Sequence, residues 1–287
     1  MLRTTISALL FSLLLISCNN KQIADREYIN ASIWTGDSSN PSASVIAVKG
    51  NKIIYVGNDA SAVNVSSDQL IDLQGKMIAP GFIDNHTHFL MGGYGLASVK
   101  LKEAKTKEEF ISIISKYCKE HPGNGWIQGG DWDHENWGGE LPQKEWVDSV
   151  TGEHPLFVQR YDGHMAFANS NAIALAKITK SSSVPEGGLM IRNEKGEPTG
   201  IFKDEALAMI NNAIPSPSER ELDEYFERAA QHAIENGVTQ INDVSTYGGW
   251  PDLETYRRAY ANKKMPLRVY SFVNLATWEK LDSFVKK

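Results

Sequence analysis

The first third of the chain is a series of short stretches in which apolar and polar residues alternate, with turn residues between them. Residues 44–49 and 52–56 flank Gly50-Asn51, a pair typical of the two-residue turn of a β-hairpin, and residues 57–59 end the second stretch. Such alternation places the apolar side chains on one face of each strand. The pattern over residues 29–79 therefore predicts a small β-domain.

Helical spacing of the apolar residues begins after residue 100. The segment 106–118 has apolar residues three and four apart behind a Thr106/Glu109 capping box, and a second box, Ser218/Glu221, opens a longer helix. From residue 200 onward, predicted strands alternate with predicted helices, and the clearest strands are residues 238–244 and 267–273. Successive β–α units favour a parallel α/β architecture.

The segment between these regions is less regular. Residues 126–139 are rich in tryptophan and glycine, which predicts a loop-rich insertion over about residues 100–198. A strand at residues 155–161 runs into Asp162-Gly163-His164. The tryptophans either fill an irregular core or line a substrate pocket, and the sequence leaves both readings open.

The composition is that of a globular protein without a nucleic-acid partner. Of the 287 residues, 41% are apolar, which is enough for the core of one large domain or two modest ones. The net charge is −6 with both signs spread along the chain, so the basic stripe that nucleic-acid binding requires is missing.

The N-terminus reads as an export signal. One early arginine is followed by an apolar run over residues 8–16, which is too short to cross a bilayer as a helix. The sequence Leu15-Ile16-Ser17-Cys18 resembles a bacterial lipobox. It predicts a lipoprotein signal peptide at residues 1–17, a lipid on Cys18 and a tether at residues 18–28; the alternative is a simple cleaved signal.

Two histidines stand two residues apart at the end of an apolar stretch. Alternate residues of a strand point to the same face, so His86 and His88 would present two imidazoles side by side. Imidazole is a common zinc ligand, and catalytic zinc takes about three protein groups, so further ligands must come from elsewhere. The alternative is two partly exposed histidines at a strand end.

The residues around this pair point to a family. The sequence Pro80-Gly81-Phe82-Ile83-Asp84-x-His86-x-His88 resembles the first barrel strand of the amidohydrolase superfamily of metal-dependent hydrolases. The resemblance implies a (β/α)8 TIM barrel over residues 80–287, beside a β-sandwich to which residues 29–79 contribute. Such a barrel takes about 250 residues, and 199 follow His88. We therefore expect four or five barrel strands and an N-terminal part of a longer protein.

The resemblance also implies a metal site. In the family the paired histidines hold one of one or two divalent ions, with zinc as the default, and many members add a carboxylated lysine that bridges two ions. His86 and His88 match the first motif, and Lys203 follows a short apolar strand as the bridging lysine would. Lys203 is otherwise a solvated lysine, and Glu205 is its substitute if it points away.

Two further residues are candidates for catalysis. Asp162-Gly163-His164 resembles a motif of the branch that includes the N-substituted formamide deformylases, in which the histidine faces the substrate; a structural histidine is the alternative. Asp243 ends a predicted strand, on the side where barrels carry their active sites. The family's later ligands, two histidines and an aspartate, have no counterpart after Asp243, since the last histidine is His232.

These expectations combine into one function with two rivals. The resemblance implies hydrolysis of a carbon–nitrogen bond other than a peptide bond, in an amide or formamide, by metal-activated water. The first rival is an inactive truncated lipoprotein or binding module, and the second is deamination or cyclic-amide hydrolysis at the same site. The expected partners are a small amide substrate, the membrane of a bacterial cell envelope through the lipid, and a second copy of the chain in a homodimer.

Overall fold

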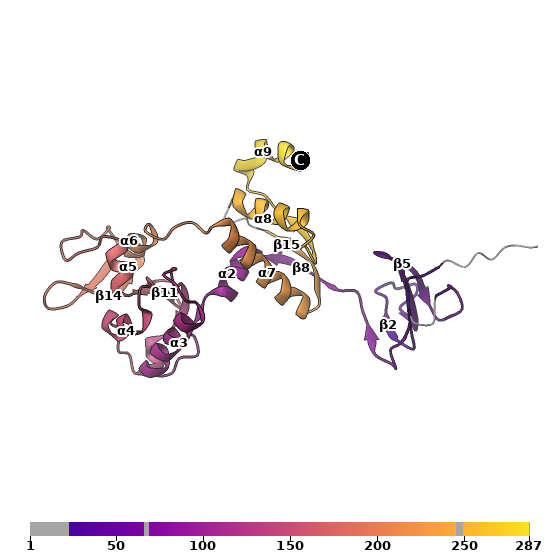
Figure 1. The fold of residues 1–287 in the computed structure, drawn as a ribbon, viewed down its shortest axis with the longest axis horizontal. Coiled ribbons are helices and arrows are strands. Elements are labelled where there is room, and N and C mark those ends of the chain that lie inside the picture. The colour runs from indigo at the N-terminus through magenta and orange to yellow at the C-terminus, as the bar shows by residue number, and fades with distance from the viewer. Residues whose placement is uncertain (1–22, 66–68, 245–248, 287) are drawn as a thin grey trace, which may run out of the picture. The chain divides into compact units, whose positions relative to one another are not determined.

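A computed structural model describes residues 23–65, 69–244 and 249–286, which divide into two compact units (Figure 1). One unit ends at Gly81 and the other begins at Phe82, two residues after the expected boundary. The predicted signal peptide at residues 1–17 and Cys18 lie outside the described residues. Within those residues, no helix combines the length and apolar character that crossing a bilayer would require.

The N-terminal unit consists of two small sheets. One has the order β5-β4-β1-β6 and the other β3-β2-β7. The predicted hairpin at Gly50-Asn51 is confirmed, because β4 and β5 pair antiparallel up to Lys49 and Lys52. The strands are β1 (Arg26–Ile29), β2 (Ser32–Trp34), β3 (Ser42–Ala43), β4 (Val45–Lys49), β5 (Lys52–Gly57), β6 (Leu70–Asp72) and β7 (Met77–Ile78).

A buried carboxyl group lies in the first of these sheets. Glu27 on β1 is opposite Ala47 of β4, and its side chain is 1% exposed. Its Oε1 atom has no hydrogen-bond partner among the described residues. Burial, with a smaller effect from the nearby charge of Asp59, raises the pKa of Glu27 above its usual value.

We expect Glu27→Gln to stabilise this unit at neutral pH by about 1 kcal/mol, because an unpaired buried carboxylate is replaced by a neutral group. The raised pKa means that the folded state binds the proton more tightly than the unfolded chain does. The stabilising contribution of Glu27 is therefore fully present below the unfolded pKa of about 4.3 and is lost as pH rises through the folded value. Urea titrations from pH 4 to pH 8 measure this fall, which the substitution should remove.

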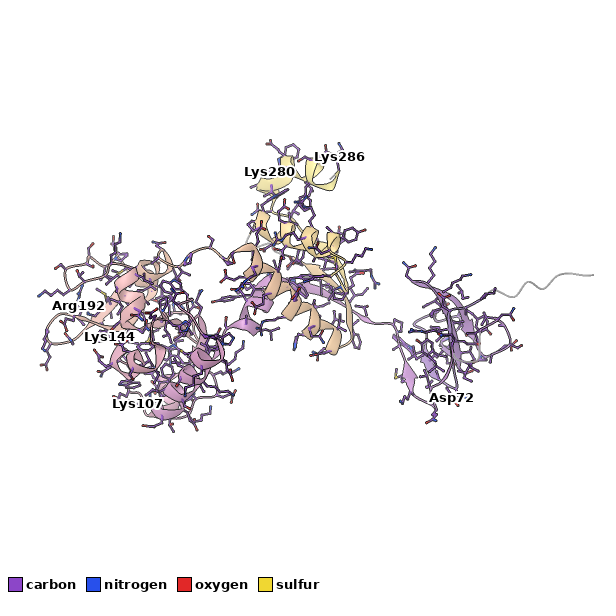
Figure 2. The ribbon with its side chains drawn as sticks, in the orientation of Figure 1. Asp72, Lys107, Lys144, Arg192, Lys280 and Lys286 are labelled. Atoms are coloured by element: carbon purple, nitrogen blue, oxygen red, sulfur yellow. The ribbon has the colours of Figure 1, made fainter. Side chains whose placement is uncertain are left out.

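The matched control for this experiment is Asp72→Asn, since Asp72 is an exposed carboxylate on the neighbouring strand β6 (Figure 2). The fall in stability that the Glu27 carboxyl causes should persist in this variant, because Glu27 is unchanged in it. Parallel profiles for Glu27→Gln and the unchanged chain would contradict the prediction.

The second unit contains a six-stranded mixed sheet with the order β13-β14-β12-β11-β10-β9. Side chains that alternate along its strands form two separate cores. Val158 and Phe167 pack on one face with helix α3 (Lys107–Glu120), while Phe157 and Ala166 pack on the other face with α5 (Ser170–Leu175) and α6 (Leu207–Asn211). Figure 1 shows α3 and α4 (Asp148–Thr151) apart from α5 and α6 in this lobe, and Figure 2 shows Lys107 at the edge of the lobe.

The elements of this six-stranded lobe follow in chain order. They are β9 (Val99–Lys100), α3 (Lys107–Glu120), β10 (Gly129–Trp132), η3 (His134–Trp137), η4 (Lys144–Trp146), α4 (Asp148–Thr151), β11 (Phe157–Arg160), β12 (Met165–Ala168), α5 (Ser170–Leu175), β13 (Leu189–Arg192), β14 (Pro198–Lys203), η5 (Asp204–Ala206) and α6 (Leu207–Asn211).

Residues 100–198 are not rich in loops as expected, because they contribute strands and helices to the six-stranded lobe; their status as an insertion stays a prediction. Gly129 and Gly130, two of the glycines that suggested loops, lie within β10, where they allow neighbouring backbone to approach closely. A Cβ on Gly129 would lie 2.5 Å from the Cβ of Ser98, and one on Gly130 would lie 2.6 Å from the carbonyl oxygen of Gln159. Both residues also have a positive φ, which favours glycine.

The rest of the second unit is a parallel three-stranded sheet, β16-β15-β8. The helices before and after these strands pack on the sheet. They share one hydrophobic core with it, which includes Phe226, Ile241 and Leu253. The elements are β8 (Phe82–Thr87), α2 (Phe89–Ala97), α7 (Glu219–Glu235), β15 (Val238–Asp243), α8 (Trp250–Ala261), β16 (Arg268–Ser271), η6 (Leu275–Thr277) and α9 (Trp278–Val285). The α/β class and the predicted strands at residues 238–244 and 267–273 are confirmed.

Four or five parallel barrel strands were expected, whereas the parallel sheet that contains β8 has three strands in the described residues. Strand β14, expected in the barrel, instead pairs antiparallel with β12 and β13 in the six-stranded sheet. Its residues Ile201 and Phe202 are almost fully buried on opposite faces, each in one of the two cores. Burial on both faces is equally typical of a parallel barrel strand, so the sequence pattern alone did not distinguish the two.

Candidate metal centre

His86 and His88 lie together where β8 meets α2. His86 is the penultimate residue of β8, and His88 is the N-cap of α2. The centroids of their rings are 5.6 Å apart and the ring planes are at 87°. The expected geometry of two neighbouring imidazoles is therefore present; their role as metal ligands stays a prediction.

A β-bulge lies in β8 at the pair. From Asp84 to Thr87, β8 advances three residues while β15 advances two, from Ile241 to Asp243. Bulges next to active sites commonly redirect a side chain. Within the bulge, the Asp84 carboxylate accepts a hydrogen bond of 3.2 Å from the backbone N–H of His86. Asp84 thus holds the backbone at the pair.

Asp243 lies at the same end of the sheet, opposite Thr87 in the β15–β8 register. Its carboxylate is 1% exposed and accepts hydrogen bonds from the backbone N–H of Phe89 at 3.2 Å and from the Tyr256 hydroxyl at 2.9 Å. Burial, and then the charge of Asp243, raise the pKa of Tyr256. The phenol therefore remains a hydrogen-bond donor throughout the physiological pH range.

The donor set fits part of a divalent metal site. Two imidazoles, His86 exposed and His88 half-buried, are suitable ligands for zinc and related ions. No third histidine, cysteine or carboxylate completes a cluster with them within the ranges that the structure describes. Since a catalytic zinc takes about three protein ligands, the pair supplies two of them and needs at least one more.

His164 and Lys203 lie in the six-stranded lobe, on a different sheet from His86. His164 immediately precedes β12, and its neighbour Met165 is opposite Lys203 of β14. The His164 ring is exposed, with Nδ1 3.1 Å from a carboxylate oxygen of Asp204. The structure therefore brings His164 and Lys203 near each other, and their predicted roles remain predictions.

A network of charged side chains borders this second pair. Arg160, which is largely buried, bonds both Asp133 at 2.9 Å and Asp162. Asp162 also accepts the backbone N–H of His164 at 3.1 Å, and the backbone N–H of Asp204 donates to the carbonyl oxygen of His164. The network fixes the backbone on both sides of the His164 ring.

Sequence reasoning missed Tyr256 and Asp204. Tyr256 occupies an ordinary apolar position of helix α8, so nothing in its local pattern distinguishes it from a core residue. Asp204 has a positive φ of 49°, which is uncommon for a residue other than glycine. Neither signal can be recognised before the neighbouring strands are placed.

Comparison with known proteins finds a matching family and similar sequences. Residues 69–286 match the amidohydrolase family. The chain is 34% identical over 269 residues to Protein LONG AFTER FAR-RED 3 of Arabidopsis thaliana, covering 90% of this chain and 46% of that protein. It is 29% identical over 259 residues to an N-substituted formamide deformylase of Arthrobacter pascens, covering 85% and 46% respectively.

A solved structure agrees with these sequence matches. An uncharacterized metal-dependent hydrolase from Pyrococcus horikoshii has a TM-score of 0.68 and 25% identity, over 90% of this chain and 50% of that one. The chain spans about half the length of the curated relatives it matches. The family match covers more than half of the chain, from the end of the N-terminal unit through α9, and the chain belongs to the amidohydrolase family.

Proposed function

We propose that the protein is a metal-dependent hydrolase that cleaves a carbon–nitrogen bond, other than a peptide bond, in a small amide or formamide. The observation that carries the proposal is the pair of imidazole rings, 5.6 Å apart, at the carboxyl end of a parallel sheet. Active sites of β/α barrels lie at this end of their strands. The similarity to a formamide deformylase supports the amide class of substrate.

The proposal includes a (β/α)8 barrel of which β8, β15 and β16 are three strands. The helices of this lobe share one core with Ile241 of β15, while Ile83, Tyr270 and Phe272 are 48–60% exposed. Exposed apolar side chains on a sheet require a partner surface. Further β/α units beside β8 and β16 would cover them and bring additional metal ligands.

His86 and His88 would hold a divalent ion, with zinc as the first choice by ligand type. Such an ion lowers the pKa of a bound water and polarises the scissile carbonyl. Lys203, if carboxylated, or otherwise Glu205, is the proposed bridge to a second ion. Because both residues lie in the six-stranded lobe, this role requires that lobe to meet the barrel mouth in the active protein.

His164 is proposed to contact the substrate. Its Nδ1 faces the Asp204 carboxylate, which leaves Nε2 on the exposed side of the ring. In that arrangement Asp204 orients the ring, and Nε2 can hydrogen-bond the substrate carbonyl. The proposed location is the bacterial cell envelope, with a lipid on Cys18 as the membrane anchor and a homodimer as the assembly.

We expect purified protein to contain a divalent metal and to hydrolyse N-substituted formamides or simple amides in a substrate panel. Dialysis against a chelator should abolish the activity, and adding back zinc should restore it, because the ion activates the water. Metal content by mass spectrometry and product amine by chromatography are the measurements. Activity that survives complete metal removal would refute the proposal, and activity on amino-purines or cyclic amides alone would reassign the substrate.

A further inference from the structure

The carboxylate of Asp243 connects three elements beneath the histidine pair. It extends from the end of β15, accepts the backbone N–H of Phe89 at the start of α2, and accepts the hydroxyl of Tyr256 from α8. Each of its two oxygens has one of these partners: Oδ1 bonds Phe89 and Oδ2 bonds Tyr256. The carboxylate is thus held from two directions inside the protein.

The bond to Phe89 fixes the backbone that carries the His88 ring. The first N–H groups of a helix lack partners within the helix and are usually satisfied by the N-cap side chain. The N-cap of α2 is His88, and its side chain makes no capping hydrogen bond. Asp243 caps the helix instead, from a neighbouring strand, and its negative charge is favourable at a helix N-terminus.

The bond from Tyr256 fixes the carboxylate in turn. Tyr256 is 6% exposed and packs edge-on against Phe226, with ring centroids 5.9 Å apart, so its hydroxyl has little freedom to move. Asp243, at 1% exposed, cannot exchange the phenol for bulk water without opening the core. The chain of contacts therefore runs from α8 through Asp243 to the residue that follows His88.

We propose that Asp243 and Tyr256 are positioning residues, which hold His88 in the direction that metal binding with His86 requires. This inference rests on the proposed metal-dependent function. It assigns Asp243 a role beneath the metal ligands instead of contact with the substrate. Residues that orient metal ligands in this way typically contribute 10- to 100-fold to metal affinity.

The first test needs no metal. Amide hydrogen exchange at Phe89 is compared in the unchanged chain, Tyr256→Phe, Asp243→Asn and a control, Tyr260→Phe. Tyr260 lies one turn further along α8 and is 76% exposed. We expect exchange at Phe89 to be about fivefold faster in the first two variants, as the loss of one buried hydrogen bond implies, and unchanged in the control.

The second test measures the metal site directly. Co²⁺ is titrated into the same four proteins, and its visible absorption bands report both affinity and ligand geometry. We expect Tyr256→Phe to bind Co²⁺ about 10- to 100-fold more weakly with altered bands, while Tyr260→Phe matches the unchanged chain.

The two tests distinguish failure of this inference from failure of the proposed metal-dependent function. Unchanged exchange at Phe89 in Tyr256→Phe would overturn the inference. Faster exchange with unchanged Co²⁺ affinity and bands would also overturn it, since the contacts would then serve folding alone. If the unchanged chain binds no Co²⁺ or Zn²⁺ although exchange responds as expected, the proposed function fails, while the link from Tyr256 to Phe89 stands.

Discussion

Replacing His88 by alanine is expected to lower the affinity for a divalent ion more than about 100-fold and to reduce hydrolysis to background. Variants of residues that only orient ligands lose about 10- to 100-fold, so loss of a ligand itself should exceed this range. The His86 and His88 rings are adjacent, and no third donor in the described parts of the chain completes a site with them. His86→Ala should have the same effect. Equilibrium dialysis against Zn²⁺ and the initial rate of amide hydrolysis are the measurements.

Two further histidines provide the controls. His232 is exposed on α7, and His232→Ala should leave metal affinity and rate unchanged. His164→Ala should keep the metal and lose rate, since His164 lies in the other lobe, where it is proposed to contact substrate. Full metal content and full rate in both His86→Ala and His88→Ala would disprove the assignment of the pair.

The elements that the sequence predicted correctly depend on neighbouring residues. The Ser218/Glu221 capping box forms at the start of α7, with both of its hydrogen bonds present. At the start of α3, the Thr106 hydroxyl accepts a hydrogen bond from the backbone N–H of Glu109. The Glu109 carboxylate accepts one from the backbone N–H of Lys105. Such motifs are complete within four or five residues, so the local pattern is sufficient to find them.

The elements that the sequence did not predict depend on distant partners. Strand β10 contains two glycines, and its pairing with β9 and β11 is set by how closely those strands can approach. The sheet to which β14 belongs depends on β12 and β13, which form a separate lobe. Propensity and alternation describe one strand at a time and carry no information about which strand lies beside it.

At the candidate site too, features set by neighbouring residues were predicted and features set by distant partners were not. His86 and His88 were found because their spacing is local, and the bulge beside them was not foreseen, since it exists only relative to β15. Asp243 was selected for its place at a strand end, and the structure shows that its carboxylate bonds Phe89 and Tyr256. A position at a strand end indicates where a residue lies but not which groups it contacts.

The tryptophan question left open by the sequence has a structural answer at one position. Trp132 is fully buried, and its Nε1–H donates a hydrogen bond of 2.9 Å to the carbonyl oxygen of Val158. Its ring packs against Phe110 and Trp137, with centroids 6.3 and 6.5 Å away. The indole therefore joins α3, β10 and β11 within one core of the six-stranded lobe.

We expect Trp132→Ala to destabilise this lobe by about 3–5 kcal/mol, because the substitution leaves a large cavity and removes the hydrogen bond from the indole to the Val158 carbonyl oxygen. Most domains have a total stability of about 5–15 kcal/mol, so the lobe would become marginal. Urea titration followed by circular dichroism measures the loss, and hydrogen exchange at β11 and β12 locates it. His164 and Lys203 border these strands, so hydrolysis should decline in parallel with unfolding.

Trp34→Ala is the matched control, since Trp34 is 55% exposed on β2 and its removal should change stability by less than about 0.5 kcal/mol. Trp132→Phe should be intermediate, because it keeps an aromatic ring and loses the hydrogen bond to Val158. If Trp132→Ala instead lowers stability by less than about 1 kcal/mol and lowers only the rate, the indole does not fill the core. The substrate-lining role of these tryptophans would then be the correct interpretation.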